Sequence, residues 1–527
     1  MTEPFPNAKN KNEIPFHPLI HKSFVFLRTL GMRSAPEILI LEMFREFFYE
    51  KTRERKYKGI DPDEKENDEY RYPEIVRAVL YSVRGRQRQG GKKSQKGHYF
   101  LPAYPSLAEN SWFRKEEAPI IATFLLEGPI ANYIWLHGKN DEEKKKDRAK
   151  FVKKFYQALI GNNSTTANDP SIEKKDILSV ALLEFLPENI LPENKVKEKI
   201  EERTSENNYL LDHVEKDELS ETIFYDLMEL IDLEKEIPRM QWLELFMTFL
   251  RFSMPMWALA QMRISNLLQG WLIEAIENGE IVKQEEIETQ IRERNRGILH
   301  PSKTPTREIY ELIESYIRDR IKINYILWDL ENIVGDKIKN KRLKINPKPP
   351  TGGLCIYNLL KLAHEASSQL KSTKHYMDAK VDNYESFLTR KSENFSLWLK
   401  PRRVGVGGNI QEFFNVLYHD SNADQLGGHL LESHRIGRSI VGFQVFPGQL
   451  LLKTITVLAG RKKHNLPGGG GLLVLGDIER HFEKYGVDFG KANEARPALA
   501  GRLKSMGLLS GSPDAGASVA VICPYLK

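Results

Sequence analysis

The last eighty residues, 447–527, carry the pattern that most restricts what this chain can fold into. Apolar side chains recur at helical spacing in three successive segments, at residues 450–458, 475–485 and 499–506. Two short runs typical of β-strands follow, at 508–509 and 519–523, around a Ser-Pro-Asp-Ala-Gly turn. The predicted order of elements is therefore helix, helix, helix, hairpin.

This order is the one found in winged helix-turn-helix modules, which most often bind DNA. The third helix would be the recognition helix, and its predicted outward-facing residues are Arg496, Arg502, Lys504 and Ser505. Cations near the start of a helix can reach phosphates or base edges. The predicted wing carries Asp514 at its tip and no cation, which makes it a poor phosphate ligand. Such folds also serve as protein-protein interfaces, so a partner-docking role stays open.

Two further basic segments are predicted to contact the DNA backbone. Arg461, Lys462 and Lys463 are expected in a loop before the glycine run at 468–471. Residues 84–97 have six cations, four glycines and no acid, which predicts a flexible arm that orders on an anion. The cations of this arm named as DNA contacts are Arg84, Arg86, Arg88, Lys92 and Lys93. A solubilising loop, or a contact for an acidic partner, is the alternative reading of the arm.

The net charge of +6 is concentrated in the same part of the chain. Residues 400–527 contain sixteen Lys/Arg and ten Asp/Glu, so the preceding 399 residues sum to about zero. Attraction to phosphate requires positive charge on the binding segment, so this distribution favours a nucleic-acid partner, most simply double-stranded DNA.

Composition indicates a folded, soluble protein. Hydrophobic residues make up 41% of the chain, and its two cysteines, Cys355 and Cys523, can form neither a disulfide framework nor a Cys-rich zinc site. Without a secretory pattern or an apolar run of membrane-spanning length, we expect a cytoplasmic protein with no membrane contact. The glycine-rich stretches at 402–409 and 468–471 lack the P-loop and dinucleotide patterns, so no cofactor is expected.

The expected fold class is mainly α, with a large helical N-terminal body and a C-terminal α+β winged-helix domain. Residues 242–276 predict two core helices joined near Pro255, residues 308–333 another helix, and residues 354–377 a further one. The predicted organisation is a flexible N-terminus at 1–22, a helical body at 23–334, a basic Pro/Gly linker at 335–353, a helical and mixed connecting region at 354–446, and the winged-helix domain at 447–527.

An alternative hypothesis places a catalytic metal site in the connecting region. Imidazole and carboxylate side chains, the ligand types of zinc and manganese, gather within sixteen residues: His419, Asp420, Asp424, His429, Glu432 and His434. Their spacing fits no motif of known geometry, and polar loop residues are the default interpretation. A metal-dependent nuclease is the second hypothesis, while the preferred assignment has no catalytic residue and no metal.

The runs Gly476–Phe489 and Arg496–Gly516 resemble winged helices encoded in restriction-like phage-defence operons, including phosphorothioation-dependent and methylation-associated systems. The resemblance implies a non-catalytic subunit that accompanies a separate ATPase moving on DNA. The expected function is therefore a non-enzymatic DNA-binding and scaffolding subunit of a multi-protein bacterial defence complex. A winged-helix interaction module without nucleic acid remains the third hypothesis.

Overall fold

The computed structural model describes residues 218–300, 305–334, 352–373, 414–418, 427–436, 439–465, 471–489, 495–510 and 513–525, with a few shorter pieces that include His17, Lys65–Glu66 (β1), Glu69–Tyr70 (β2) and Tyr376. The basic arm at 84–97 and most of the linker at 335–353 lie outside these residues, as does nearly all of the helical body expected before residue 218.

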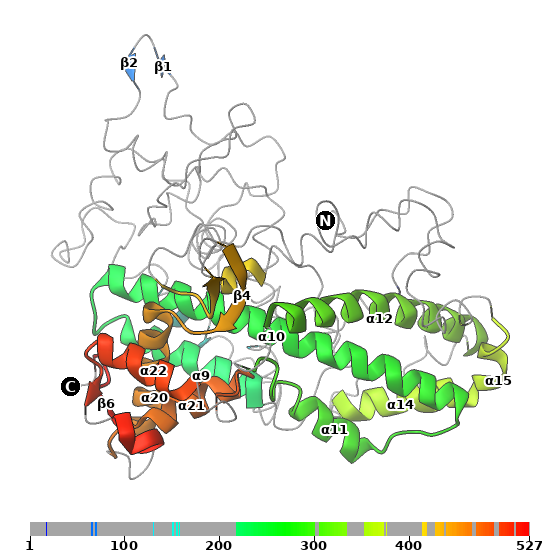
Figure 1. Cartoon of the computed structure of the whole chain (residues 1–527). Helices are drawn as coiled ribbons and strands as arrows, with labels where there is room; N and C mark the ends of the chain where they lie inside the picture. Colours follow the sequence, from blue (N-terminus) through cyan, green and yellow to red (C-terminus); the bar gives the residue numbers. More distant parts are fainter. Residues whose placement is uncertain are drawn as a thin grey trace.

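One long helix, α10 (Arg239–Glu277), runs through the centre of the described fold (Figure 1). It continues through Pro255, so the prediction of two helices joined there was wrong. Proline removes one backbone hydrogen bond and crowds the preceding turn. Here the residues on both sides of it, from Trp242 to Ile276, are largely buried against neighbouring helices, and this packing outweighs the local cost.

Four helices surround one end of α10 (Figure 1). They are α11 (Gln284–Arg292), α12 (Pro305–Val334), α14 (Gly352–Glu365) and α15 (Ser367–Leu370). Helix α12 contains the predicted segment 308–333 and lies along α10. The single helix expected at 354–377 is instead interrupted at Ala366, which has φ −91° and ψ 3°. His17 reaches α12, where its backbone N–H donates to Asn324 Oδ1 at 2.7 Å.

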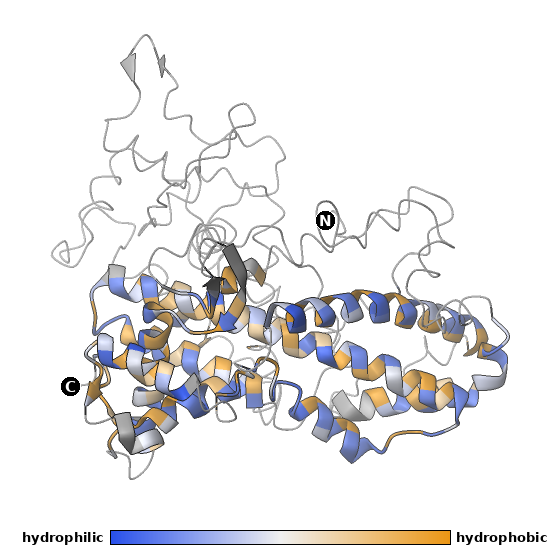
Figure 2. Ribbon diagram, viewed as in Figure 1, coloured by the Kyte–Doolittle hydropathy of each residue, from blue (hydrophilic) through white to orange (hydrophobic). Residues whose placement is uncertain are grey.

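The other end of α10 carries α9 (Glu218–Leu233) and the C-terminal helices, drawn in orange and red in Figure 1. A hairpin formed by β3 (Leu431–Ile436) and β4 (Ser439–Val445) leads into them. Apolar side chains of α9, α10 and the C-terminal helices share one core, and Figure 2 shows the orange faces of the helices turned toward one another. The C-terminal segment is thus packed into the helical body.

The described part of the chain is mainly helical, as the sequence predicts, and its strands are short. Within these residues, no helix combines the length and the apolar character that crossing a membrane would require.

Candidate nucleic-acid interface

The C-terminal segment has the predicted order of elements. Three helices, α20 (Gln449–Asn465), α21 (Leu475–Lys484) and α22 (Ala495–Ser505), are followed by β5 (Leu509–Ser510), a 3-10 segment η6 (Pro513–Ser518) and β6 (Ala520–Val521). Strands β5 and β6 pair antiparallel, and Val474 forms an antiparallel bridge to Ala520 on the other side of β6. The hairpin therefore gains a third short strand from the residues before α21. We call residues 449–525 the C-terminal module.

Helix α21 shows how the sequence sets this local structure. Its apolar residues Leu475, Ile478 and Phe482 are buried on one face, as their spacing predicts. At its start the carboxylate of Asp477 accepts a hydrogen bond from the Val474 amide at 3.0 Å. Just after the end of α21 comes Gly486, whose backbone φ of +94° is readily adopted by glycine.

The segment 461–464 lies in the last turn of α20, so its prediction as a loop was wrong. Gly460, just before this segment, is also within α20. Two physical effects favour the extra turn: cations are stabilised near helix C-termini, and Arg461 finds carboxylates on the neighbouring helical body. The basic side chains are therefore held on a helix.

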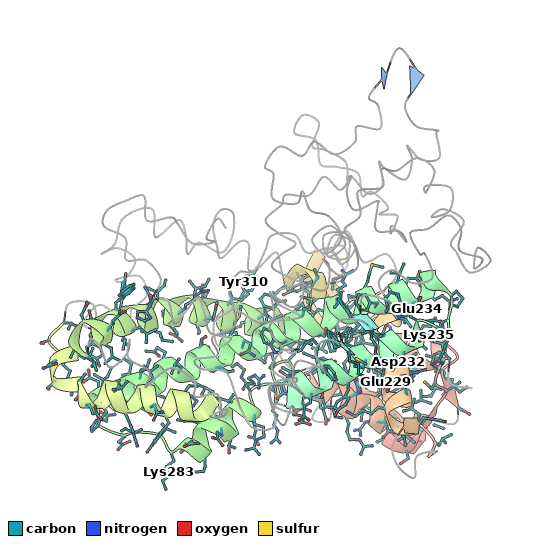
Figure 3. All side chains as sticks on the ribbon, turned by 180° about the vertical axis from the view of Figure 1, so that it is seen from behind. Glu229, Asp232, Glu234, Lys235, Lys283 and Tyr310 are labelled. Carbon is teal, nitrogen blue, oxygen red and sulfur yellow. The ribbon has the colours of Figure 1, made fainter. Side chains whose placement is uncertain are left out.

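Arg461 joins α20 to the C-terminal end of α9. Its Nε donates to Glu229 at 2.9 Å, and its two terminal nitrogens donate to both oxygens of Glu236 at 2.9 and 3.0 Å. Figure 3 shows Glu229 at this end of α9, with Asp232, Glu234 and Lys235 labelled nearby. Only 13% of the Arg461 side chain is exposed. The guanidinium is thus committed to an internal ion pair that DNA would have to replace.

Lys463 is bound in a similar way, to the start of α21. Its Nζ lies 2.7 Å from Asp477 Oδ2 and donates to the Leu472 carbonyl at 2.7 Å. Arg480 also contacts Asp477. Burial of Asp477 opposes its ionisation, but hydrogen bonds from Lys463, the Val474 amide and Arg480 outweigh that effect and hold the pKa of its carboxyl below the ordinary value. Asp477 therefore stays charged and stabilises the junction between α20 and α21.

On α22, Arg496 forms a two-pronged ion pair with Glu479 of α21. Its Nε and Nη2 donate to the two carboxylate oxygens at 2.7 and 2.8 Å. Glu479 is only 3% exposed, so the pair supplies a counter-charge that a buried carboxylate needs. This geometry fixes α22 against α21.

Helical spacing predicts that Arg502 faces outward from α22, but other residues cover its side chain in the structure. Its guanidinium lies 3.7 Å from the centroid of the Phe446 ring and donates to Glu432 at 2.9 Å and to the Pro447 carbonyl at 2.8 Å. Only 18% of the side chain is exposed. Helical periodicity places Arg502 away from Leu499 and Leu503 but cannot show that the β3–β4 hairpin occupies that side.

Lys504 and Ser505 do lie at the surface, as predicted. The Ser505 hydroxyl donates to the Arg502 carbonyl at 2.7 Å. The other exposed residues of α22 are small or apolar: Pro497, Ala498 and Gly501. The outward face of α22 therefore combines a narrow, small-residue surface with a lysine at its C-terminal end.

Lys462 lies beside a second lysine that sequence reasoning did not identify. The Nζ of Lys462 is 5.7 Å from the ring centroid of Tyr225. The second lysine is Lys484, at the end of α21, with which Lys462 interacts. Burial first, and then the ammonium group of Lys462, lower the pKa of Lys484. Two basic side chains from different helices thus meet, and the charges of Asp226 and Glu218 act in the opposite direction on the pKa of Lys484.

A buried polar network joins the C-terminal module to α9. Tyr485 Oη donates to Asp226 Oδ2 at 2.7 Å, and His481 Nε2 lies 2.7 Å from the same oxygen. Burial, and after it the charge of Asp226, raises the pKa of Tyr485 well above its ordinary value, so the phenol remains a donor. Sequence patterns could not reveal this network, because Asp226 and His481 are 255 positions apart.

The alternative metal cluster is only partly within the described residues, which exclude His419, Asp420 and Asp424. Of the others, Glu432 is paired with Arg502, and His429 is buried at 4% exposure. In the described ranges, no three His, Cys, Asp or Glu side chains lie close enough together to hold a metal ion.

The five arm cations, Arg84, Arg86, Arg88, Lys92 and Lys93, lie outside the described residues, and their assignment to DNA stays a prediction. No protein-family model, curated protein or solved structure matches this chain.

Proposed function

We propose that this chain is a non-enzymatic scaffolding subunit of a multi-protein bacterial defence complex, and that its C-terminal module contacts double-stranded DNA. The observation that carries the proposal is the arrangement of α20, α21 and α22 followed by a hairpin that a third strand extends through Val474. This is the element order of winged helices, whose third helix most often approaches DNA. The partner ATPase, or other defence subunits, follows from the sequence resemblance.

The ion pairs divide the proposed DNA contacts into two groups. Arg461, Lys463, Arg496 and Arg502 each have an internal carboxylate partner, so they hold the module together and support the DNA face indirectly. Lys504 and Ser505 lie on the outward face of α22, and within the part of the chain that the structure describes Lys504 forms no ion pair that phosphate would have to break. Lys462 adds charge at the end of α20. DNA would thus be held by few cations of the module, assisted by the arm at 84–97.

A second function is favoured by the same geometry. Because the most exposed residues of α22 before Lys504 are Pro497, Ala498 and Gly501, and the charge of Arg496 is paired with Glu479, this surface also suits close packing against a protein. In that case the module would be an interaction domain that makes no contact with nucleic acid. A nuclease role gains no support from the described residues.

A charge-reversal pair tests DNA contact at α22. Lys504→Glu is expected to weaken binding of a short DNA duplex by about tenfold, since it removes a charged phosphate contact and adds repulsion. Lys283→Glu makes the same charge change at an exposed position before α11 (Figure 3) and should bind as the wild type does. Fluorescence anisotropy at fixed salt measures both. Equal affinities for the two variants would remove α22 from the DNA interface.

A further inference from the structure

Two of the most exposed large apolar side chains in the described residues lie together on the small sheet of the C-terminal module. Leu472 is 66% exposed and Ile522 is 53% exposed, and the third such side chain, Tyr225, is on α9. Isolated surface apolar residues need no explanation, but residues grouped on one sheet face often mark a binding surface.

The register of the strands shows that Leu472 and Ile522 are direct neighbours. Val474 pairs with Ala520, and the Val521 amide donates to the Leu473 carbonyl at 2.8 Å, so Leu472 stands opposite Ile522. On the other side of β6, the Ile522 amide donates to the Leu508 carbonyl at 2.7 Å. Side chains at directly opposed positions project from the same face of a sheet. Leu472, Ile522 and the half-buried Leu508 therefore form one row at the end of the small sheet, just beyond its paired residues, which we call the apolar row.

The described residues around the apolar row include more cations than carboxylates. The three chain segments that contain these strands and the Val474 bridge, 471–475, 506–510 and 519–525, contain no Asp, Glu, Lys or Arg. Lys463 contacts the Leu472 carbonyl. Arg480 is 67% exposed, and Arg480 and Lys463 both contact the mostly buried carboxylate of Asp477. At the other end Lys453 lies over the Tyr525 ring, 4.8 Å from its centroid. Among the described side chains with these contacts, which we call the rim, three cations stand against one carboxylate.

We infer that the apolar row is the docking site for a protein partner that offers an apolar side chain flanked by carboxylates. The row supplies the apolar contact, while Lys453 and the exposed Arg480, with the net positive charge of the rim, select acidic flanks. A second copy of this chain is a poorer occupant, because symmetric docking would bring the same cationic rims together. The inference rests on the proposed scaffolding role and identifies the surface that would carry it, distinct from the DNA face at Lys504.

Synthetic peptides provide a defined probe. The full-length chain is titrated with a fluorescent peptide of alternating leucine and glutamate, and with matched peptides of alternating leucine and lysine and of alternating serine and glutamate. Only the leucine–glutamate peptide is expected to bind. Leu472→Asp and Ile522→Asp should each weaken its binding by about tenfold, a loss of about 1.4 kcal/mol. Tyr225→Asp alters the third exposed apolar position and should leave the affinity unchanged.

The outcomes separate this inference from the proposed function. Equal binding of the leucine–lysine peptide, or unchanged affinity in both row variants, would overturn the docking site. The docking site would also be overturned if the molecular mass of the wild-type chain in solution rose with concentration while Ile522→Asp remained a monomer. A second copy of the chain would then occupy the row. Ile522→Asp should keep wild-type DNA affinity, and its loss would assign the row to the DNA face instead. A wild-type chain that binds the peptide but no DNA would count against DNA contact alone.

Discussion

Replacing Asp226 with alanine is expected to lower the free energy of unfolding by about 3 kcal/mol. Asp226 is 1% exposed, and its Oδ2 contacts both Tyr485 Oη and His481 Nε2 at 2.7 Å. Removing the carboxylate leaves two buried polar groups without their partner, and such groups cost far more than the net gain from an ordinary hydrogen bond. Because the network joins α9 to α21, the loss should fall on the junction between the helical body and the C-terminal module.

Asp226→Asn is the matched control. The amide oxygen can still accept from Tyr485 and His481, so we expect a smaller loss, about 1 kcal/mol. Urea unfolding measures both variants, and amide hydrogen exchange in α21 localises the effect. Equal losses for alanine and asparagine would show that the charge of Asp226, and not its hydrogen bonding, stabilises the junction. Exchange in α21 that stays at the wild-type rate in Asp226→Ala would contradict the assignment of the network to this junction.

Gly486→Ala is the second variant with a large expected effect, again a loss of about 3 kcal/mol. Gly486 has φ +94°, and a Cβ there would lie 2.3 Å from the backbone oxygen of Asn295. Its own carbonyl accepts the amides of Ile298 and Leu299 at 2.9 and 3.0 Å. The backbone cannot shift to admit a methyl group without breaking this contact between the α11–α12 connection and the end of α21.

Gly501→Ala gives the opposite result and serves as the control. Gly501 lies within α22, and a Cβ there would meet nothing within 4 Å. Alanine should therefore stabilise the helix by about 0.5–1 kcal/mol. Thermal unfolding of both variants makes the comparison. A melting temperature for Gly486→Ala at or above that of the wild type would mean that the backbone contact at Asn295 does not constrain the fold.

The sequence predicted best where apolar periodicity was strong and local. Helix α12 and the three helices of the C-terminal module lie where the spacing places them, since one buried stripe is enough to define each helix. The prediction of a helix break at Pro255 was wrong because tertiary packing along α10 overrides the local preference of proline. The loop expected at 461–464 failed for a related reason, because Arg461 gains carboxylates from α9 that local sequence cannot reveal.

Site residues were harder to predict, because charge in sequence does not show its partner in space. Arg502 and Glu432 are 70 positions apart, and Arg461 and Glu229 are 232 positions apart. In the sequence each arginine looks available for binding, because its carboxylate partner is brought close only when the chain folds. The prediction of Lys504 as a surface residue from helical spacing was confirmed, since no other element of the described structure covers that part of α22. The partners of the arm at 84–97 cannot be assigned from periodicity at all.

The salt dependence of DNA affinity tests the central claim, that this chain binds DNA through phosphate contacts. Affinity for a short duplex is measured by anisotropy between about 50 and 200 mM salt. Each phosphate contact should contribute about 0.9 to the negative slope of log affinity against log salt, and Lys504→Glu should reduce that slope by about one contact. Steep salt dependence in the wild type, and the reduced slope in Lys504→Glu, are the predicted result. Absence of duplex binding at the lowest salt, or an affinity that does not change with salt, would contradict it.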